Sequence, residues 1–469
     1  METLNHIVYI ILLTFWFSTI PVAALTLIRF IRNHRKFIEK NPVRIHNDPT
    51  IIFQITTRSA TNTPVVKRGI QSIRKSAKKI NFDNYIISVI TEDKRDLKIG
   101  KRNECQIIVV DQDYRTNAIK KSRALQYAVE FRKTTKQNTK EYWIFHMDDE
   151  SYATEQTLLS LLKYIREGEG IASEGPITYP LKFEDANPIT ALAESVRPFS
   201  CYDCVSQMTN PPPLHMHGSN LLVRADIEEE IGWNFGVTLA EDQIFGYKIY
   251  EKYGRKALGW HGGILLEQPP LNIKDHFMQR RRWILGTLQN MYRFPIIHKF
   301  KLTFKLISYC MGFISGIASM TLFILTMLPR FEALFDIVVK QNITEPNIIF
   351  ENIKYLFIPF LPSQPNPDIN QILLSNNYYP IDIGLFSYLL LFPYVMWLLS
   401  YQIGLALNLY YKDVSIIKKI GLHFQALVLS FVLGIMETFP AFYSVIEYYT
   451  KRNMRKEEIY KYDFYVINK

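Results

Sequence analysis

An acidic motif that follows a β-rich run is the first group of residues that could carry out chemistry. Residues 146–151 read HMDDES, and the run YWIFHM at 142–147 predicts a strand, so the acids lie at its carboxyl end. In a strand or tight turn, Asp148 and Glu150 point the same way and Asp149 points oppositely. Two hard oxygen ligands at that spacing suit Mg²⁺ or Mn²⁺ bridging a diphosphate. An acidic turn on the surface would give the same pattern.

Two more motifs combine charged residues with helical patterns. The acidic pair at 241–242 stands at the start of an apolar helical pattern, where acids can also serve simply as helix caps. Residues 279–283 read QRRRW, and on a helix Gln279, Arg282 and Trp283 share one face. Arginine makes bidentate contacts to phosphate, and an indole offers a platform for a sugar. A basic stop before a membrane would account for the arginines, but it would not need the Gln and the Trp.

Several weaker signals have equally ordinary explanations. Residues 114–123 predict a basic helix start that could receive a pyrophosphate or simply face solvent. The turn HGSN at 217–220 would let backbone approach a ligand closely, as would many ordinary turns. Residues 267–270, EQPP, predict an extended segment leading into the arginine-rich helix. Cys201 and Cys204 form a single CxxC, which we interpret as two packed thiols because the sequence has no second pair and no βαβ redox context.

The composition indicates a soluble domain joined to a membrane region. With 48% hydrophobic and 21% charged residues, the chain is not of a disordered class. Its mean hydropathy of −0.03 is high for a chain with 55 basic and 44 acidic residues, and a charged part averaged with an apolar part explains it. The net charge of +11 suits a protein beside an anionic leaflet, or one that binds phosphates.

The soluble part, residues 50–270, reads as an α/β domain. Short β-rich runs alternate with charged helical stretches, which predicts a parallel sheet with helices on both faces. The runs are at 51–56, 85–90, 106–110 and 142–147, and the helical stretches include 65–80 and 117–133. Ligands of such sheets bind at the carboxyl ends of the strands.

The membrane region has several candidate spans. Residues 7–28 carry no charge over about 22 positions, enough for a helix to cross a bilayer core. The run is too long for a signal peptide, and basic residues at 29–44 follow it, so the next domain is expected in the cytoplasm. Further spans are expected at 307–328, 383–410 and 421–446.

The carboxyl-terminal region leaves two topologies open. Lysines at 412–419 indicate a cytoplasmic loop, and the basic tail 451–469 favours the same side. A full crossing between them would put the tail on the wrong side. Either residues 421–449 form a re-entrant or interfacial hairpin bent at Pro440, or the positive-inside rule fails here.

The joint order of these motifs resembles glycosyltransferase family 2, in its membrane-embedded, inverting form. Within that family the sequence is most similar to the egghead-type β-1,4-mannosyltransferases, which share Glu in the metal motif. The shared stretches are TRSA (57–60), YRTNAIKKSRALQYAVE (114–130), WIFHMDDES (143–151), GPITY (175–179), AEDQIF (240–245), QRRRW (279–283) and FYVINK (464–469).

The resemblance implies a role for each matching position. Asp242 matches the general base, with Glu241 beside it, and Asp148 and Glu150 match the metal ligands, so Mg²⁺ or Mn²⁺ is the expected cofactor. The implied donor-binding residues are Thr57, Arg58, Asp93, Arg115, Lys121, Arg123, Asp148, Gln279 and Arg282. The implied acceptor-binding residues are Gly218, Ser219, Asn220 and Trp283.

The resemblance also implies an activity and a domain organisation. We expect a multi-pass membrane enzyme that moves mannose from GDP-mannose to a lipid-linked or glycolipid acceptor in β-linkage, with no nucleic-acid partner. The alternatives are a processive synthase that uses UDP-sugars, like hyaluronan or cellulose synthases, and an inactive membrane scaffold. The expected parts are a transmembrane helix at 1–30, a cytoplasmic Rossmann-like (GT-A) domain of mixed sheet at 45–270, an interfacial QxxRW region at 271–300, transmembrane or re-entrant helices at 301–450 and a cytoplasmic tail at 451–469.

Overall fold

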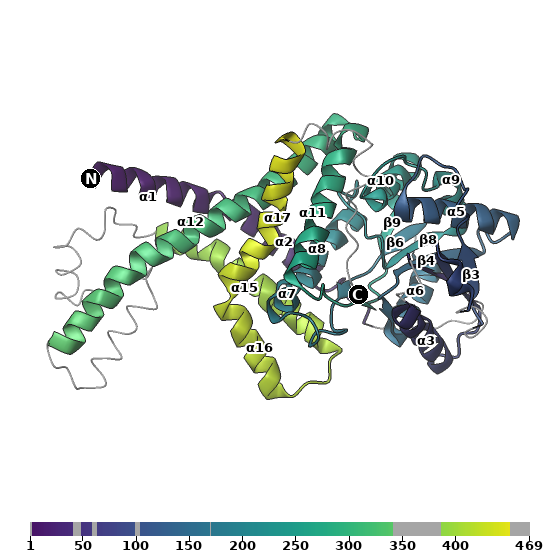
Figure 1. Ribbon diagram of the computed structural model, residues 1–469, viewed down its shortest axis with the longest axis horizontal. Helices are drawn as coiled ribbons and strands as arrows, with labels where there is room; N and C mark the ends of the chain where they lie inside the picture. The colour runs from purple at the N-terminus through teal and green to yellow at the C-terminus, as the bar shows by residue number, and fades with distance from the viewer. Residues whose placement is uncertain are drawn as a thin grey trace.

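The computed structural model describes residues 2–40, 48–58, 63–98, 104–168, 170–340 and 386–450. A sheet domain occupies one end of the molecule, and long helices extend from it towards the other end (Figure 1). The tail 451–469, including the shared stretch FYVINK, lies outside the described residues. Residues 59 and 60 of the TRSA stretch also lie outside them.

A seven-stranded mixed sheet forms the centre of the sheet domain, and this confirms the predicted mixed α/β class. Its strand order is β3-β2-β1-β4-β8-β6-β9. The strands are β1 (Thr50–Thr56), β2 (Tyr85–Thr91), β3 (Gln106–Val109), β4 (Tyr142–Asp148), β6 (Ala172–Glu174), β8 (Leu221–Arg224) and β9 (Leu258–Trp260). The four β-rich runs correspond to β1–β4. A smaller sheet has the order β5-β10-β7, formed by Tyr152–Ala153, Leu265–Leu266 and Ile177–Thr178.

Strand direction brings the ends of three strands to one edge of the large sheet. β1 runs parallel to β2 and to β4, and Thr56 at the end of β1 pairs with Asp148 at the end of β4. β8 runs antiparallel to β4, so Leu221 at the start of β8 pairs with His146 near the end of β4. The turn at 217–220 therefore reaches the same edge as the acids that follow β4.

Helices cover both faces of the large sheet because side chains alternate along each strand. On β1, Ile52 belongs to the core formed with α5 (Lys120–Thr134), α9 (Ala225–Ile231) and α10 (Glu241–Tyr253). Its neighbours Ile51 and Phe53 belong to the opposite core, formed with α3 (Thr63–Lys79) and α6 (Glu155–Glu167). The predicted helices at 65–80 and 117–133 correspond to α3 and α5.

A buried ion pair crosses the first of these cores. Arg132 on α5 and Glu228 on α9 lie 2.5 Å apart, with side chains only 3% and 0% exposed. Glu228 also accepts a hydrogen bond from Trp233 Nε1 at 2.7 Å and lies 3.1 Å from His146 Nε2 on β4. Burial alone would raise the pKa of Glu228, but Arg132 and His146 outweigh it and lower that pKa to about 2. The pair therefore stays ionised at neutral pH and fixes α5 and α9 to the sheet.

The helix α8 (Val196–Thr209) connects the sheet domain to the amino-terminal helix α2 (Ile20–Asn33). Asn33 Nδ2 donates a hydrogen bond to the Tyr202 carbonyl oxygen at 2.9 Å. Beyond α2, Phe37 stacks on the Tyr202 ring, and its carbonyl oxygen accepts a hydrogen bond from Trp260 Nε1 on β9 at 3.0 Å. The amino-terminal helix is therefore attached directly to both α8 and the sheet.

The remaining elements are mostly helical. They are α1 (Glu2–Phe17), η2 (Lys94–Asp96), α7 (Pro188–Ala193), η3 (Arg255–Ala257), α11 (Ile273–Asn290), η4 (Met291–Arg293), α12 (Ile296–Lys340), α15 (Phe386–Tyr410), α16 (Ile416–Val428) and α17 (Ser430–Thr450). Among the described residues, two helical stretches are long and apolar enough to cross a membrane, Ile10–Asn33 and Ile296–Thr321. α16 and α17 add a third if the pair, bent by 64°, counts as one span. The described residues thus include two or three helices suited to membrane association.

The bend near the carboxyl terminus lies at Leu429, so the expectation of a bend at Pro440 is wrong. α16 ends at Val428, α17 begins at Ser430, and Pro440 lies inside α17. A proline removes one helical hydrogen bond, but α17 packs along α11 and α12, and Pro440 is buried in that packing. Tertiary packing therefore keeps α17 continuous through the proline.

Arg132→Leu should destabilise the protein because it leaves the carboxylate of Glu228 buried without its cation. Removing one partner of a buried pair costs about 3–5 kcal/mol, whereas replacing both partners with apolar side chains costs far less. We therefore expect Arg132→Leu to lower the melting temperature in detergent more than Arg132→Leu/Glu228→Leu does. Circular dichroism during heating measures both. A double variant less stable than the single variant would contradict this view of the pair.

Candidate active site

One large cavity, of about 1480 Å³, brings together most of the residues that the sequence marked as candidates. It lies at the carboxyl ends of β1 and β4 and is lined also by the turn before β8, the start of α10 and one face of α11. The predicted site residues that line it are Thr57, Arg58, Lys121, Asp148, Glu150, Gly218, Ser219, Glu241, Asp242, Gln279, Arg282 and Trp283. Gln279, Arg282 and Trp283, which the QRRRW spacing predicts on one face of α11, all line this cavity, and Arg280 lines it too.

Lys121 is the central cation of the cavity. Its Nζ donates to Asp148 Oδ1 at 2.5 Å and to the Gly218 carbonyl oxygen at 2.9 Å. Burial disfavours the charged ammonium, but the carboxylates of Asp148, Glu241 and Asp242 outweigh it and raise the pKa of Lys121. The lysine is therefore charged and connects the acidic motif after β4 to the turn before β8.

The acids after Asp148 do not follow strand alternation. Asp149 lines the cavity together with Asp148 and Glu150, so the expectation that it points away is wrong. The reason is local: β4 ends at Asp148, and the next two residues form a turn. In that turn, Asp149 Oδ2 accepts a hydrogen bond from Thr57 Oγ1 at 3.0 Å. Arg68 on α3 donates to the Glu150 carbonyl oxygen at 3.2 Å, a contact that no sequence motif indicated.

A hydroxyl network fixes the turn before β8 beside β4. Ser219 Oγ and Ser151 Oγ both donate to Glu267 Oε1, at 2.6 and 3.1 Å. The Asp148 backbone N–H donates to Ser151 Oγ at 3.1 Å. The sequence placed Glu267 only in an extended segment. In the structure it holds the turn after β4 beside the turn before β8.

Asp242 is a carboxyl group whose pKa lies near neutrality. Burial and then repulsion from Glu241 raise the pKa of Asp242 to about 7, although Lys121 and Arg282 act in the opposite direction. Gly218 faces it so closely that an added Cβ would lie 3.0 Å from Asp242 Oδ2 and 3.1 Å from Lys121 Nζ. A carboxyl group with a pKa close to the working pH is suited to accept a proton.

Helix α11 also positions the segment that precedes Asp242. Asn290 Nδ2 donates to the Ala240 carbonyl oxygen at 2.8 Å, and Asn290 Oδ1 accepts from Thr238 Oγ1 at 2.8 Å. Gly286 lies against Ala240, where an added Cβ would meet the Ala240 backbone nitrogen at 2.9 Å. The small residue lets the two segments pack closely, so α11 sets the start of α10.

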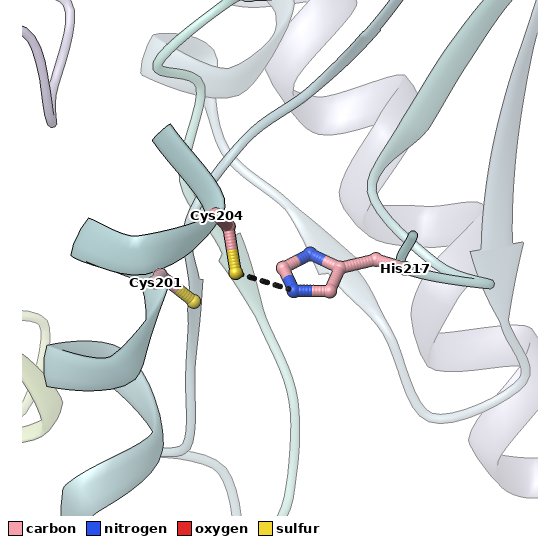
Figure 2. Close-up of side chains that lie close together, drawn as sticks. All are labelled: Cys201, Cys204 and His217. Carbon is pink, nitrogen blue, oxygen red and sulfur yellow. Dashed lines mark hydrogen bonds between the residues drawn. The ribbon is translucent and has the colours of Figure 1, made fainter. Parts of the chain in front are cut away.

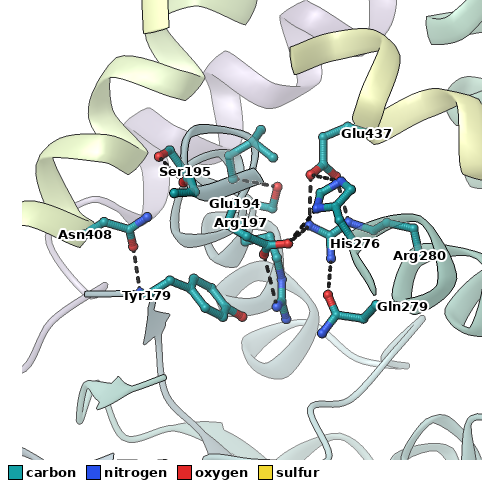
Figure 3. A network of polar contacts seen from close by, with 12 residues as sticks. Tyr179, Glu194, Ser195, Arg197, His276, Gln279, Arg280, Asn408 and Glu437 are labelled. Atoms are coloured by element: carbon teal, nitrogen blue, oxygen red, sulfur yellow. Dashed lines mark hydrogen bonds and ion pairs between the residues drawn. The ribbon is translucent and has the colours of Figure 1, made fainter. Parts of the chain in front are cut away.

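The other two arginines of the QRRRW motif attach α11 to α17, and Figure 3 shows the contacts of Arg280. Arg280 donates to Glu437 through Nε at 2.9 Å and to Glu194 through Nη2 at 2.8 Å. Arg281 donates to Glu447 at 2.6 and 3.0 Å. The guanidinium groups of Arg280 and Arg197 lie over the Trp283 ring, 4.6 and 4.5 Å from its centroid. The motif is therefore no simple basic stop: two of its arginines are bound to acids, and Arg282 lines the cavity.

Four of the predicted residues lie elsewhere. Arg115 and Arg123 line a second cavity of about 460 Å³, which shares the residue Glu92 with the large one. Asp93 lines neither of these two cavities and instead caps η2, and Asn220 is fully buried, where its amide donates to two backbone carbonyl oxygens. The tight turn explains why an asparagine stands at position 220: its φ of 57° lies in the left-handed region, which Asn tolerates.

The sequence of the chain matches a family of sugar transferases. The model of glycosyl transferase family group 2 matches residues 143–407, which is more than half of the chain, and the chain belongs to this family. The match begins in β4 and includes the acidic motif, Asp242 and the QRRRW helix. It confirms the resemblance found in the sequence.

The particular relatives are mannosyltransferases. The chain is 25% identical over 261 residues to β-1,4-mannosyltransferase egh of Drosophila melanogaster, covering 54% of this chain and 55% of that protein. It is 26% identical over 271 residues to β-1,4-mannosyltransferase bre-3 of Caenorhabditis elegans, covering 56% and 58%. The matched region thus spans little more than half the length of these curated relatives.

A distant likeness is to the solved structure of mannosyltransferase PcManGT from Pyrobaculum calidifontis, in complex with GDP-Man and Mn²⁺. The alignment covers 95% of this chain and 99% of that one, at 12% identity and a TM-score of 0.43. This likeness is too distant to carry an inference about the site.

Asp242→Asn should stabilise the protein at high pH because the buried carboxylate opposes folding. The folded pKa of about 7 exceeds the ordinary value of 3.8, so the acid favours folding below pH 4, and that advantage is lost as pH rises through 7. Each unit by which the folded pKa exceeds the unfolded pKa lowers the free energy of unfolding at high pH by about 1.4 kcal/mol. We expect Asp242→Asn to raise the melting temperature above pH 7 and to change it little near pH 4. Equal melting temperatures at pH 8 would show that the pKa is not raised.

Proposed function

We propose that this chain is a membrane-bound inverting glycosyltransferase that moves mannose from GDP-mannose to a lipid-linked acceptor. The observation that carries the proposal is the single cavity in which Asp242, with its pKa near 7, faces Lys121 and the acids after β4. The names of the curated relatives support mannose as the sugar and a β-linkage. GDP as the carrier follows from the resemblance to the egghead-type proteins.

Asp242 is the proposed general base. The acceptor hydroxyl oxygen forms a bond to the anomeric carbon, the bond from that carbon to the diphosphate breaks on the opposite face, and the hydroxyl proton passes to Asp242. Nucleoside diphosphate leaves. Glu241 contributes by raising the pKa of Asp242, which makes it a stronger base. Lys121 and Arg282 supply positive charge beside the departing diphosphate.

The acids after β4 are the proposed metal site. Asp148 has a side chain 34% exposed to the cavity, and Glu150 also lines it. Among the described residues, neither belongs to a group of three converging His, Cys, Asp or Glu donors. Mg²⁺ and Mn²⁺ sites of this kind use one or two carboxylates plus substrate phosphates and water, so two acids suffice. A bound divalent cation would neutralise charge on the diphosphate.

The shape of the cavity supports a lipid-linked acceptor. From the carboxylates it continues between α2, α12, α15 and α17, where its lining is largely apolar and aromatic. Trp283 lines this cavity, and its ring contacts the guanidinium groups of Arg197 and Arg280. A sugar headgroup could thus reach Asp242 while its hydrocarbon chain remains among the membrane helices.

We place the catalytic domain, 45–270, in the cytoplasm, with α11 as the interfacial element at 271–300 and the helices of 301–450 in or on the membrane. The basic residues that follow the first apolar helix support this orientation. α16 exposes Ile416, Ile417, Ile420 and Phe424, as an interfacial helix does.

Membranes containing the protein should transfer mannose from labelled GDP-mannose to a lipid-extractable product, at a rate that rises with pH to a plateau above about 7. Asp242→Asn should reduce the rate about 10²–10⁴-fold because the proton acceptor is lost. Donor binding should persist, since Asp242 holds no diphosphate contact. Glu241→Gln should move the midpoint of the pH profile lower, because it removes the repulsion that raises the pKa of Asp242.

Three results would overturn this assignment. Transfer by Asp242→Asn within about threefold of the parent rate would place the base elsewhere. Polymer formation from a UDP-sugar would favour a processive synthase. Asp242→Asn failing to bind donor would move that residue into the donor site.

Removal of divalent cations should abolish transfer and weaken donor binding together. We expect EDTA to stop the reaction and Mn²⁺ or Mg²⁺ to restore it. Asp148→Asn should weaken GDP-mannose binding as well as turnover, because the diphosphate loses its metal. Isothermal titration with donor, with and without metal, measures this. Full activity in chelator would exclude the metal role of Asp148 and Glu150.

A cysteine placed on the sheet domain should report its side of the membrane. In a Cys105→Ser background, Lys79→Cys on the exposed end of α3 should resist an impermeant maleimide in intact cells and react after permeabilisation. Labelling of intact cells would place the domain outside.

A further inference from the structure

A compact group of thiol and imidazole side chains lies beside the active site without a part in the proposed chemistry. Cys201 and Cys204 are one turn apart on α8, and both face His217 of the turn that precedes β8 (Figure 2). One donor atom from each of the three lies within 4.8 Å of the others. Interpreting the cysteines as two packed thiols explains their burial, but it does not explain the imidazole aimed at them.

The distance between Cys204 and His217 matches that between two ligands of one tetrahedral metal ion. Cys204 Sγ lies 3.4 Å from His217 Nε2. With zinc–sulfur and zinc–nitrogen bonds of about 2.3 and 2.0–2.1 Å, a tetrahedron places sulfur and nitrogen ligands about 3.5 Å apart. Small side-chain rotations are therefore enough to bring the donors around an ion.

A buried carboxylate stands behind the histidine, where metal-binding histidines commonly have one. His217 Nδ1 lies 3.8 Å from Glu174 Oε2, and neither atom has a hydrogen-bond partner among the described residues. Glu174 is 0% exposed, and its Oε1 already accepts the His217 backbone N–H at 2.5 Å. A carboxylate that receives Nδ1–H orients the ring so that Nε2 binds metal. His217 Nδ1 and Glu174 Oε2 are buried without a hydrogen-bond partner among the described residues, and a small approach of the two atoms would form this contact.

A second histidine, His215, has a different role in the same group. Its Nε2 lies 3.2 Å from Cys204 Sγ, but its Nδ1 lies 3.1 Å from Lys305 Nζ. A lysine ammonium can only donate, so His215 Nδ1 accepts and its Nε2 carries the hydrogen. His215 therefore donates a hydrogen bond to the Cys204 sulfur, which stabilises a thiolate without ligating the ion.

We infer that Cys201, Cys204 and His217 bind a zinc ion. Two thiol protons leave as the thiolates bind, and thiolate with imidazole selects zinc over the magnesium or manganese expected at Asp148. All three ligands line the large cavity, so the fourth position is open to it. The ion would hold the turn that carries Gly218, the residue bound by Lys121, against α8.

A second convergent group, Glu194, His276 and Glu437, is better explained without a metal. Arg280 lies between its two carboxylates, 2.8 Å from each, and already neutralises them. In the described part of the chain, no arginine or lysine hydrogen-bonds to Cys201, Cys204 or His217, and the two sulfurs prefer a soft ion.

Cobalt substitution tests the zinc site directly on the full-length protein in detergent. After dialysis against chelator, one equivalent of Co²⁺ should produce a thiolate-to-cobalt charge-transfer band and the visible bands of tetrahedral cobalt. One equivalent of Zn²⁺ should then remove both, because zinc binds such sites more tightly than cobalt. Elemental analysis should find one zinc per chain. If bound Co²⁺ shows no charge-transfer band, or if the protein binds no metal, the inference is wrong. Both results come from the parent protein and need no variant.

Matched variants assign the ligands. Cys201→Ser, Cys204→Ser and His217→Gln should each lose the stoichiometric band, whereas Cys105→Ser and His215→Gln should keep it. Asp148→Asn should also keep it, which separates this ion from the cation proposed for the donor. Loss of the band in Asp148→Asn or in His215→Gln would show that the ligand set is wrong. None of these measurements depends on sugar transfer, so they stand or fall apart from the proposed activity.

Discussion

The guanidinium of Arg280 is the contact on which the arrangement of the active site depends. It lies between Glu194, at the end of α7, and Glu437 of α17, and His276 lies 3.0 Å from the first of these acids (Figure 3). Arg280, Glu194 and His276 are buried, and buried charges are tolerated only when they are paired and hydrogen-bonded. Because the pairing joins α7, α11 and α17, it sets the position and rotation of α11. That rotation in turn decides which face of the QRRRW motif lines the cavity.

A second consequence of fixing α11 is electrostatic. The helix brings Arg282 towards the cavity and, through Asn290, holds the start of α10, so Asp242 has a fixed distance from every charge around it. Lys121 is shared among three carboxylates, which leaves none of them fully neutralised. Such a site is costly in an empty protein and is suited to a substrate that brings its own charge and a proton to remove. The raised pKa of Asp242, which makes its carboxylate oppose folding, and its proposed role as a base therefore have the same physical origin.

The sequence predicted the elements whose signals are local. The β-rich runs became β1–β4, and the spacing of Gln279, Arg282 and Trp283 correctly gave one helical face. Membership of the transferase family followed from the order of the motifs. The interactions that the sequence did not indicate join residues far apart along the chain. Arg68 reaches Glu150, and Arg280 finds its acids at positions 194 and 437. The predicted direction of the Asp149 side chain was wrong because the alternation of a strand was extended one residue into a turn. The predicted bend at Pro440 was wrong because packing outweighs the loss of one helical hydrogen bond. His217 and the CxxC pair are separated by the end of α8 and by residues 210–216, so their convergence has no signature in spacing.

The continuity of the cavity between α2, α12, α15 and α17 has a kinetic consequence for any acceptor that carries a hydrocarbon chain. Taking such a chain out of the bilayer costs about 0.8 kcal/mol for each methylene, and a cavity open along the helices removes the need for that step. Encounter then becomes a search in two dimensions, governed by the mole fraction of acceptor in the surrounding lipid. Adding inert lipid would slow such a catalyst, whereas adding buffer would leave the acceptor side of the reaction unchanged.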